Sequence, residues 1–227
     1  MRMRLICLSL LLAAMLSAQA ADVELQLLDR DGKPLGDAVL VLESSVPGPR
    51  PTPPATLVIA QEKMRFMPAV AVAHLSTTVR FTNLDRWDHH VRGGVAGPGG
   101  IYLDSSQGYA FRLAGRERNK PPASSEQRYT QTGPQMLGCH LHGSMRGFLY
   151  VTDSPWAAVS DEQGRVKLSG VPAGSARLRI WHADALVDTP LQELQVVEGM
   201  AAQRVATPIV QRKPRRAPPE ELKMPGY

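Results

Sequence analysis

Residues 138–147 read GCHLHGSMRG and place a thiol, an imidazole and a thioether at intervals of three, in Cys139, His142 and Met145. A short loop with this spacing lets all three side chains converge on one ion. A thiolate, two imidazoles and a weak axial thioether form the ligand set of a mononuclear copper electron-transfer site. The loop therefore predicts one copper ion, cycling between Cu(I) and Cu(II), with one further histidine supplied from elsewhere.

Residues 83–91, NLDRWDHHV, supply that histidine from a distant part of the chain. Two candidates stand side by side, His89 and His90. The other histidines are expected to have different roles: His140 alternates with the loop ligands and points away, while His74 and His182 lie at the surface or in packing. We expect Met64, Met67 and Met136 to pack in strands, although three thioethers could also form a second soft Cu(I) site.

The first twenty residues, MRMRLICLSLLLAAMLSAQA, have the pattern of a secretory signal peptide. Arg2 and Arg4 precede a short apolar run, and a small-x-small cleavage pattern follows, so we expect cleavage before Ala21. The mature protein is then periplasmic or secreted. Cys7 leaves with the signal peptide, and Cys139 alone cannot form an internal disulfide in an oxidising compartment.

The net charge of +5 is unevenly distributed. Part of it leaves with the signal peptide, and the segment after residue 202 is basic, so the body between them is close to neutral. Nothing in it resembles a nucleic-acid-binding face. No other apolar run reaches membrane-spanning length, so we expect no stable insertion into a membrane.

Short alternating segments predict an all-β fold. Residues 23–27 and 148–151 have strand patterns, and Leu178 and Ile180 are expected to face a core within the strand 176–182. Residues 116–131 form an expected polar loop, and residues 46–55, with five prolines in ten positions, form a stiff connector. Glycine- and proline-rich turns at this spacing favour a β-sandwich.

The two ligand segments resemble those of cupredoxins of the plastocyanin and amicyanin type, and the resemblance covers roughly residues 60–152. It implies a Greek-key β-sandwich over residues 56–153. The N-x-D-x-x-x-H-H-V pattern maps the ligand onto His89 and puts His90 where the family has a bracing asparagine. His90 as the ligand stays the alternative. The complete arrangement is also similar to periplasmic proteins of the methylamine-utilisation-like type.

The flanking segments resemble a second family. LLDRDGKPLGDAVLVLE (27–43) and SDEQGRVKLSGVPAGSARLRI (160–180) are similar to the two halves of a carboxypeptidase regulatory-like, transthyretin-like β-sandwich. This implies a discontinuous domain of residues 21–50 and 154–200, into which the cupredoxin is inserted. The alternative is a single cupredoxin decorated with extra strands. Residues 201–227 are expected to be a disordered, basic, proline-rich tail.

Together these patterns predict a one-electron carrier between periplasmic redox proteins. Storage or delivery of copper is the alternative. Catalysis at the metal is not expected, because His89, Cys139, His142 and Met145 fill four positions and leave none open for a substrate.

Overall fold

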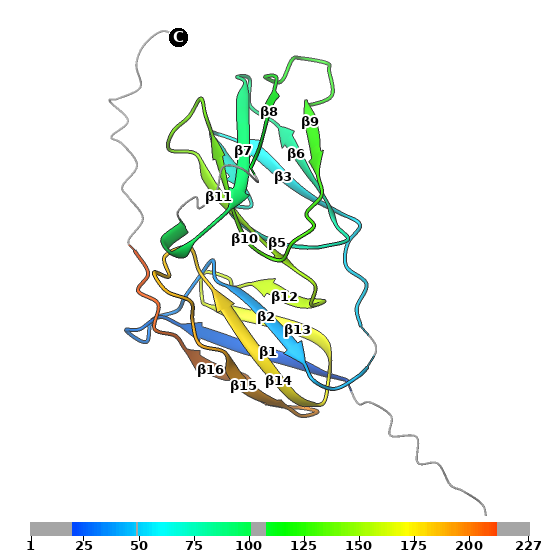
Figure 1. The fold of residues 1–227 in the computed structure, drawn as a ribbon, viewed down its shortest axis with the longest axis vertical. Coiled ribbons are helices and arrows are strands. Elements are labelled where there is room, and N and C mark those ends of the chain that lie inside the picture. Colours follow the sequence, from blue (N-terminus) through cyan, green and yellow to red (C-terminus); the bar gives the residue numbers. More distant parts are fainter. Residues whose placement is uncertain (1–19, 49, 101–107, 213–227) are drawn as a thin grey trace, which may run out of the picture.

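The computed structural model describes residues 20–48, 50–100 and 108–212. Over these residues the fold is all-β, as the sequence predicts, with sixteen strands and a single turn of 3-10 helix. Figure 1 shows two β bodies stacked end to end. No helix of the described residues is long and apolar enough to cross a membrane. The predicted signal peptide, apart from Ala20 in the first strand, lies outside the described residues.

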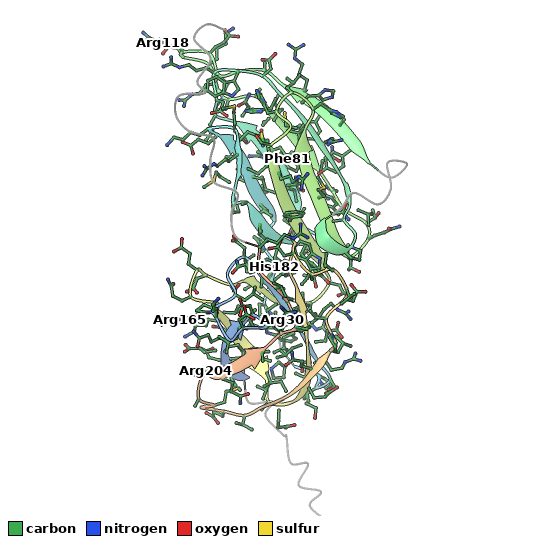
Figure 2. All side chains as sticks on the ribbon, turned by 90° about the vertical axis from the view of Figure 1, so that its left-hand side faces the viewer. Arg30, Phe81, Arg118, Arg165, His182 and Arg204 are labelled. Atoms are coloured by element: carbon green, nitrogen blue, oxygen red, sulfur yellow. The ribbon has the colours of Figure 1, made fainter. Side chains whose placement is uncertain are left out.

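The upper body consists of two facing sheets. A five-stranded sheet has the order β5-β11-β10-β7-β8, and a four-stranded sheet has the order β4-β3-β6-β9. The strands are β3 (Thr56–Glu62), β4 (Arg65–Met67), β5 (Val70–His74), β6 (Thr78–Asn83), β7 (His89–Val95), β8 (Tyr109–Leu113), β9 (Ser124–Gln127), β10 (Gly133–Cys139) and β11 (Arg146–Thr152). Apolar side chains from both sheets, including Phe66, Phe81 and Leu137, fill the space between them. Figure 2 shows Phe81 inside this body. Alternation along each strand places one set of side chains in the core and the other outside.

The lower body contains the chain before and after the upper one. Its two sheets have the orders β13-β1-β16 and β12-β2-β14-β15. The strands are β1 (Ala20–Leu28), β2 (Val39–Ser44), β12 (Trp156–Val159), β13 (Arg165–Pro172), β14 (Gly174–Trp181), β15 (Gln192–Val196) and β16 (Gln203–Ala206). A separate core forms here, and Leu178 and Ile180 face it as expected.

A third, smaller apolar cluster joins the two bodies. Val39 and Val41 of β2 pack with Val70 of β5 and Tyr150 of β11. The Trp181 ring lies 5.6 Å from that of Phe148 and 6.0 Å from that of Tyr150, measured between centroids. The two bodies are therefore joined by packed aromatic side chains as well as by the two segments of chain that connect them.

The structure differs from the sequence expectation at two places. Residues 203–206 form β16, which pairs in parallel with β1, so the predicted disordered tail does not begin at residue 201. Val205 and Ile209 are buried in the lower core. The sequence did not predict this strand because two apolar residues in a proline- and arginine-rich segment form no periodic pattern. The remaining tail, residues 213–227, lies outside the described residues.

Within the expected polar loop 116–131, residues 124–127 form the edge strand β9 against β6.

Candidate metal centre

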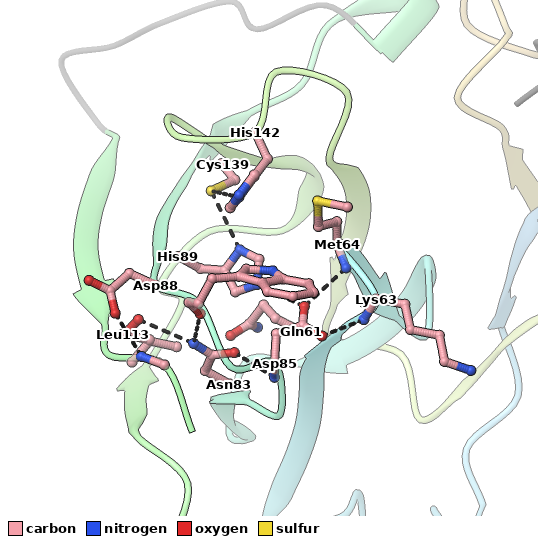
Figure 3. Close-up of polar contacts among 12 residues, drawn as sticks. Gln61, Lys63, Met64, Asn83, Asp85, Asp88, His89, Leu113, Cys139 and His142 are labelled. Atoms are coloured by element: carbon pink, nitrogen blue, oxygen red, sulfur yellow. Dashed lines mark hydrogen bonds and ion pairs between the residues drawn. The ribbon is translucent and has the colours of Figure 1, made fainter. Parts of the chain in front are cut away.

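Three of the four predicted side chains converge at one end of the upper body. The Sγ atom of Cys139 lies 3.7 Å from Nδ1 of His89 and 3.5 Å from Nδ1 of His142. The three atoms all lie within 4.8 Å of one another. His89 is fully buried and Cys139 nearly so, while His142 is partly exposed. Figure 3 shows the contacts of Cys139 with His89 and His142.

Strand pairing explains why residues 50 positions apart meet. β7 and β10 are antiparallel neighbours, and Cys139 pairs with Val91, two residues beyond His89. Because side chains alternate, Cys139, Val91 and His89 all point to the inner face. Residues 140–145 then turn back into β11, and the Met145 amide donates to the His142 carbonyl at 2.9 Å. This turn returns His142 towards the sulfur of Cys139.

The other candidates are placed as follows. Met145 comes directly before β11, is 2% exposed and packs in the same core cluster as Cys139. His90 and His140 face outward, with ring centroids 4.8 Å apart, so their side chains are separated from the inner group by the backbone. Met64 and Met67 are exposed and Met136 is buried.

A buried carboxylate fixes the orientation of His89. Asp85 Oδ2 lies 2.9 Å from His89 Nε2, and the amides of Lys63 and Met64 donate to the same carboxylate at 2.7 and 3.0 Å. Burial by itself raises the pKa of Asp85, but the hydrogen bonds from Met64, His89 and Lys63 outweigh it and hold the pKa below its ordinary value. The carboxylate of Asp85 accepts a hydrogen bond from Nε2, and this contact places Nδ1 on the side facing Cys139.

The turn that holds Asp85 has an uncommon backbone. Lys63 and Met64 both have positive φ, at 51° and 56°, although neither is glycine. Such conformations cost free energy and persist where the surrounding structure requires them. Here they aim two consecutive amides at the carboxylate of Asp85.

A second buried polar side chain braces the loop between β6 and β7. The Asn83 amide donates to the carbonyls of Trp87 at 2.8 Å and Ala114 at 2.9 Å, and its oxygen accepts from the Asp85 amide at 2.9 Å. Asn83 is fully buried. Asn83 and Asp85 stand in the same N-x-D-x-x-x-H pattern as His89, and their roles become visible only from these contacts.

Two further effects prepare the group for a cation. The His90 amide donates a hydrogen bond to Cys139 Sγ at 3.4 Å and so helps to fix the position of the sulfur. Burial, and secondarily the potential of His89, lower the pKa of His142, so this ring is neutral at pH 7 and has a lone pair available.

The spacing of the donor atoms fits a transition metal ion. Zinc, with bonds of about 2.0 Å to imidazole and about 2.3 Å to thiolate, holds nitrogen and sulfur about 3.5–3.7 Å apart at bond angles near 110–120°. The two sulfur–nitrogen distances here, 3.5 and 3.7 Å, fall in that range. The group could hold a metal ion without a change of fold.

Comparison with known proteins gives limited results. No model of a known protein family matches the chain, and no curated protein matches it. Among solved structures, two amicyanin mutants in the reduced state are 24% and 23% identical, cover 43% of this chain and 82% and 83% of their own, and have TM-scores of 0.30. An amicyanin mutant in its reduced Cu(I) form at pH 4 is 22% identical, covers 50% of this chain and 98% of its own, and also has a TM-score of 0.30.

Proposed function

We propose that this protein is an exported mononuclear type 1 copper protein that carries single electrons between periplasmic redox partners. The observation that carries the proposal is the convergence of the Cys139 sulfur with one ring nitrogen each of His89 and His142. This donor set favours copper over hard cations, which prefer oxygen ligands.

In the proposed site, His89 and His142 would hold copper through Nδ1, Cys139 through Sγ, and Met145 through its thioether. Copper would supply the one-electron couple. The protein holds the donors in place: β7 and β10 fix His89 and Cys139, and Asp85 fixes the tautomer of His89. Donors that keep their positions in both oxidation states reduce the rearrangement that accompanies electron transfer. His142, beside the exposed Leu141, is the proposed point of electron exit.

The rest of the chain supports a proposal about its domain organisation. We infer that residues 56–153 form the copper domain, and that residues 21–50 and 154–200, extended by β16, form a carboxypeptidase regulatory-like scaffold. The two separate hydrophobic cores support this division. Four protein donors leave no open position at the metal, which supports a carrier and not an enzyme.

Copper storage or delivery is the second candidate, and the partial exposure of His142 favours it. The two functions differ in how tightly the ion is held. A carrier should show reversible voltammetry and slow loss of copper to chelators in both oxidation states. A delivery protein should release Cu(I) within seconds to a competing soft ligand.

The proposal is tested by the visible absorption spectrum of the oxidised, copper-loaded protein. An intense thiolate-to-copper charge-transfer band is expected, and Cys139→Ser should abolish it. A control, Ser144→Ala, changes a hydroxyl in the same loop and should keep the band. A band that survives in Cys139→Ser would show that the sulfur assignment is wrong.

A further inference from the structure

The outer face of the five-stranded sheet has an unbalanced charge. Strands β5, β7, β8, β10 and β11 contain no aspartate or glutamate. Three exposed arginines, Arg92, Arg112 and Arg146, point outward from β7, β8 and β11. All three lie towards the end of the sheet that carries the candidate metal centre. The opposite end of β7 leads to Gly99, whose amide donates a hydrogen bond to the Ala185 carbonyl of the lower body.

The strand register aligns two of these arginines across a glycine. Arg92 of β7 pairs with Gly138 of β10, which in turn pairs with Arg146 of β11. Arg92 Nε would lie 3.1 Å from a Cβ atom added at Gly138, so the Arg92 side chain reaches across the glycine. In the next row, His90 pairs with Arg112, and the His140 amide donates to the His90 carbonyl at 3.0 Å.

Two of the arginines have no compensating charge among the residues that the structure describes. Arg112 forms an ion pair with Asp88. Within the described part of the chain, neither Arg92 nor Arg146 has a carboxylate partner. Two strand spacings, about 10 Å, separate the backbones of these two residues, and their like charges repel each other. A negatively charged partner that covers these two arginines would offset the repulsion between them.

This face is also close to the candidate metal centre. Cys139 lies between Gly138 and His140, and its side chain is on the inner face, whereas the His140 ring lies on the outer face beside His90. The His90 amide, from the neighbouring strand, donates a hydrogen bond to the Cys139 sulfur. A molecule seated over Gly138 is therefore separated from the sulfur by the backbone of a single sheet.

We propose that Arg92, Gly138 and Arg146, together with His90 and His140, form the docking face for a redox protein whose own contact surface is acidic. We call these five residues the arginine face. The inference rests on the proposed electron-carrier function and names the chemistry of its partner. Since the folded body is close to neutral, the attraction exerted by the body comes from this local patch and not from the body's net charge.

The test uses small redox reagents of opposite charge. Reduced, copper-loaded protein is oxidised in a stopped-flow instrument by hexacyanoferrate(III), which accepts one electron from Cu(I), or by the cationic tris(phenanthroline)cobalt(III). The variant Arg92→Gln/Arg146→Gln should react with hexacyanoferrate(III) at least about threefold more slowly at low ionic strength, and the difference should shrink as salt is added. The rate with the cobalt complex should not fall.

A matched control separates the patch from the net charge. Arg165→Gln/Arg177→Gln removes the same charge from exposed positions of the lower body and should leave the hexacyanoferrate(III) rate unchanged. Equal slowing in both double variants, or no slowing in either, would overturn the proposed docking role of the arginine face.

A second measurement does not require copper. Binding of polyglutamate to the Cys139→Ser protein is measured by calorimetry, with and without each pair of arginine substitutions. Weaker binding only when Arg92 and Arg146 are replaced supports the face even if the copper proposal fails. Binding that does not depend on these two arginines overturns it, whatever the protein's redox behaviour.

Discussion

The Oδ2 atom of Asp85 lies 2.9 Å from Nε2 of His89, and this contact leaves Nδ1 of His89 as the nitrogen that faces Cys139. His89 is fully buried and Asp85 is 7% exposed, so water competes little for either group. Asp85 is tied in turn to the Lys63–Met64 turn through two backbone amides. The orientation of one proposed ligand thus depends on a hairpin from the opposite sheet.

Replacing Asp85 by asparagine should weaken copper binding by about 10- to 100-fold, the usual effect of losing the partner of a ligating histidine. The reduction potential should also rise, because removal of a nearby negative charge favours Cu(I). Chelator competition and voltammetry measure the two effects. Asp88→Asn removes the same charge from an exposed carboxylate paired with Arg112 and is the control. Equal changes in both variants would argue against a positioning role for Asp85.

Alanine replacements should separate the two adjacent histidines. His89→Ala removes a buried donor and should abolish the copper charge-transfer band and reduce copper stoichiometry well below one. His90→Ala should retain both, because its ring faces outward beside His140. Metal analysis and visible spectra check the result, and a lost band in His90→Ala with a normal site in His89→Ala would reverse the assignment.

Stability should fall in mild acid because of His182. Figure 2 places this residue near the junction of the two bodies. Burial lowers its pKa from the ordinary value of 6.5, despite the attraction of Asp184 and Asp37. Its Nδ1 accepts a hydrogen bond from the Asp184 amide at 3.0 Å, which requires a neutral nitrogen.

The unfolded chain therefore takes up a proton at higher pH than the folded chain does. The stability that His182 contributes is complete above pH 6.5 and is lost as the pH falls towards its folded-state pKa. His182→Asn, whose oxygen can accept the same amide bond, should flatten the decline in unfolding free energy from pH 7 to pH 5. It should cost about 1 kcal/mol at pH 7. Denaturant unfolding at each pH measures the slope, and identical slopes in both proteins would contradict the prediction.

Two truncated chains should separate the contribution of β16 to stability from that of the residues after it. A chain ending at residue 202 loses the parallel pairing with β1 and the burial of Val205 and Ile209. Each buried side chain contributes about 1.5–3 kcal/mol, so the unfolding free energy should fall by several kcal/mol. A chain ending at residue 212 keeps these contacts and is the control. Equal thermal stability of the two chains would show that β16 contributes nothing to the fold.

The sequence by itself determined the all-β class and the loop that brings Cys139, His142 and Met145 together. Alternating patterns specify strands because the side-chain period of a strand is two, and C-x-x-H-x-x-M fits in one loop. Leu178 and Ile180 could be assigned to a core on the same basis. These are local properties, and they can be read along the chain.

Tertiary structure decided what depends on pairing between distant segments. His89 and His90 are equivalent by residue type, and only the register of β7 against β10 sends one inward and the other outward. Asp85 gains its role because β3 and β4 bring two amides to it, and Arg92 meets Arg146 only through Gly138. β16 is a strand because β1 offers a free edge and a core for Val205, although its own composition predicts disorder. Hydrogen bonding and burial supplied by a partner strand can override weak local preference.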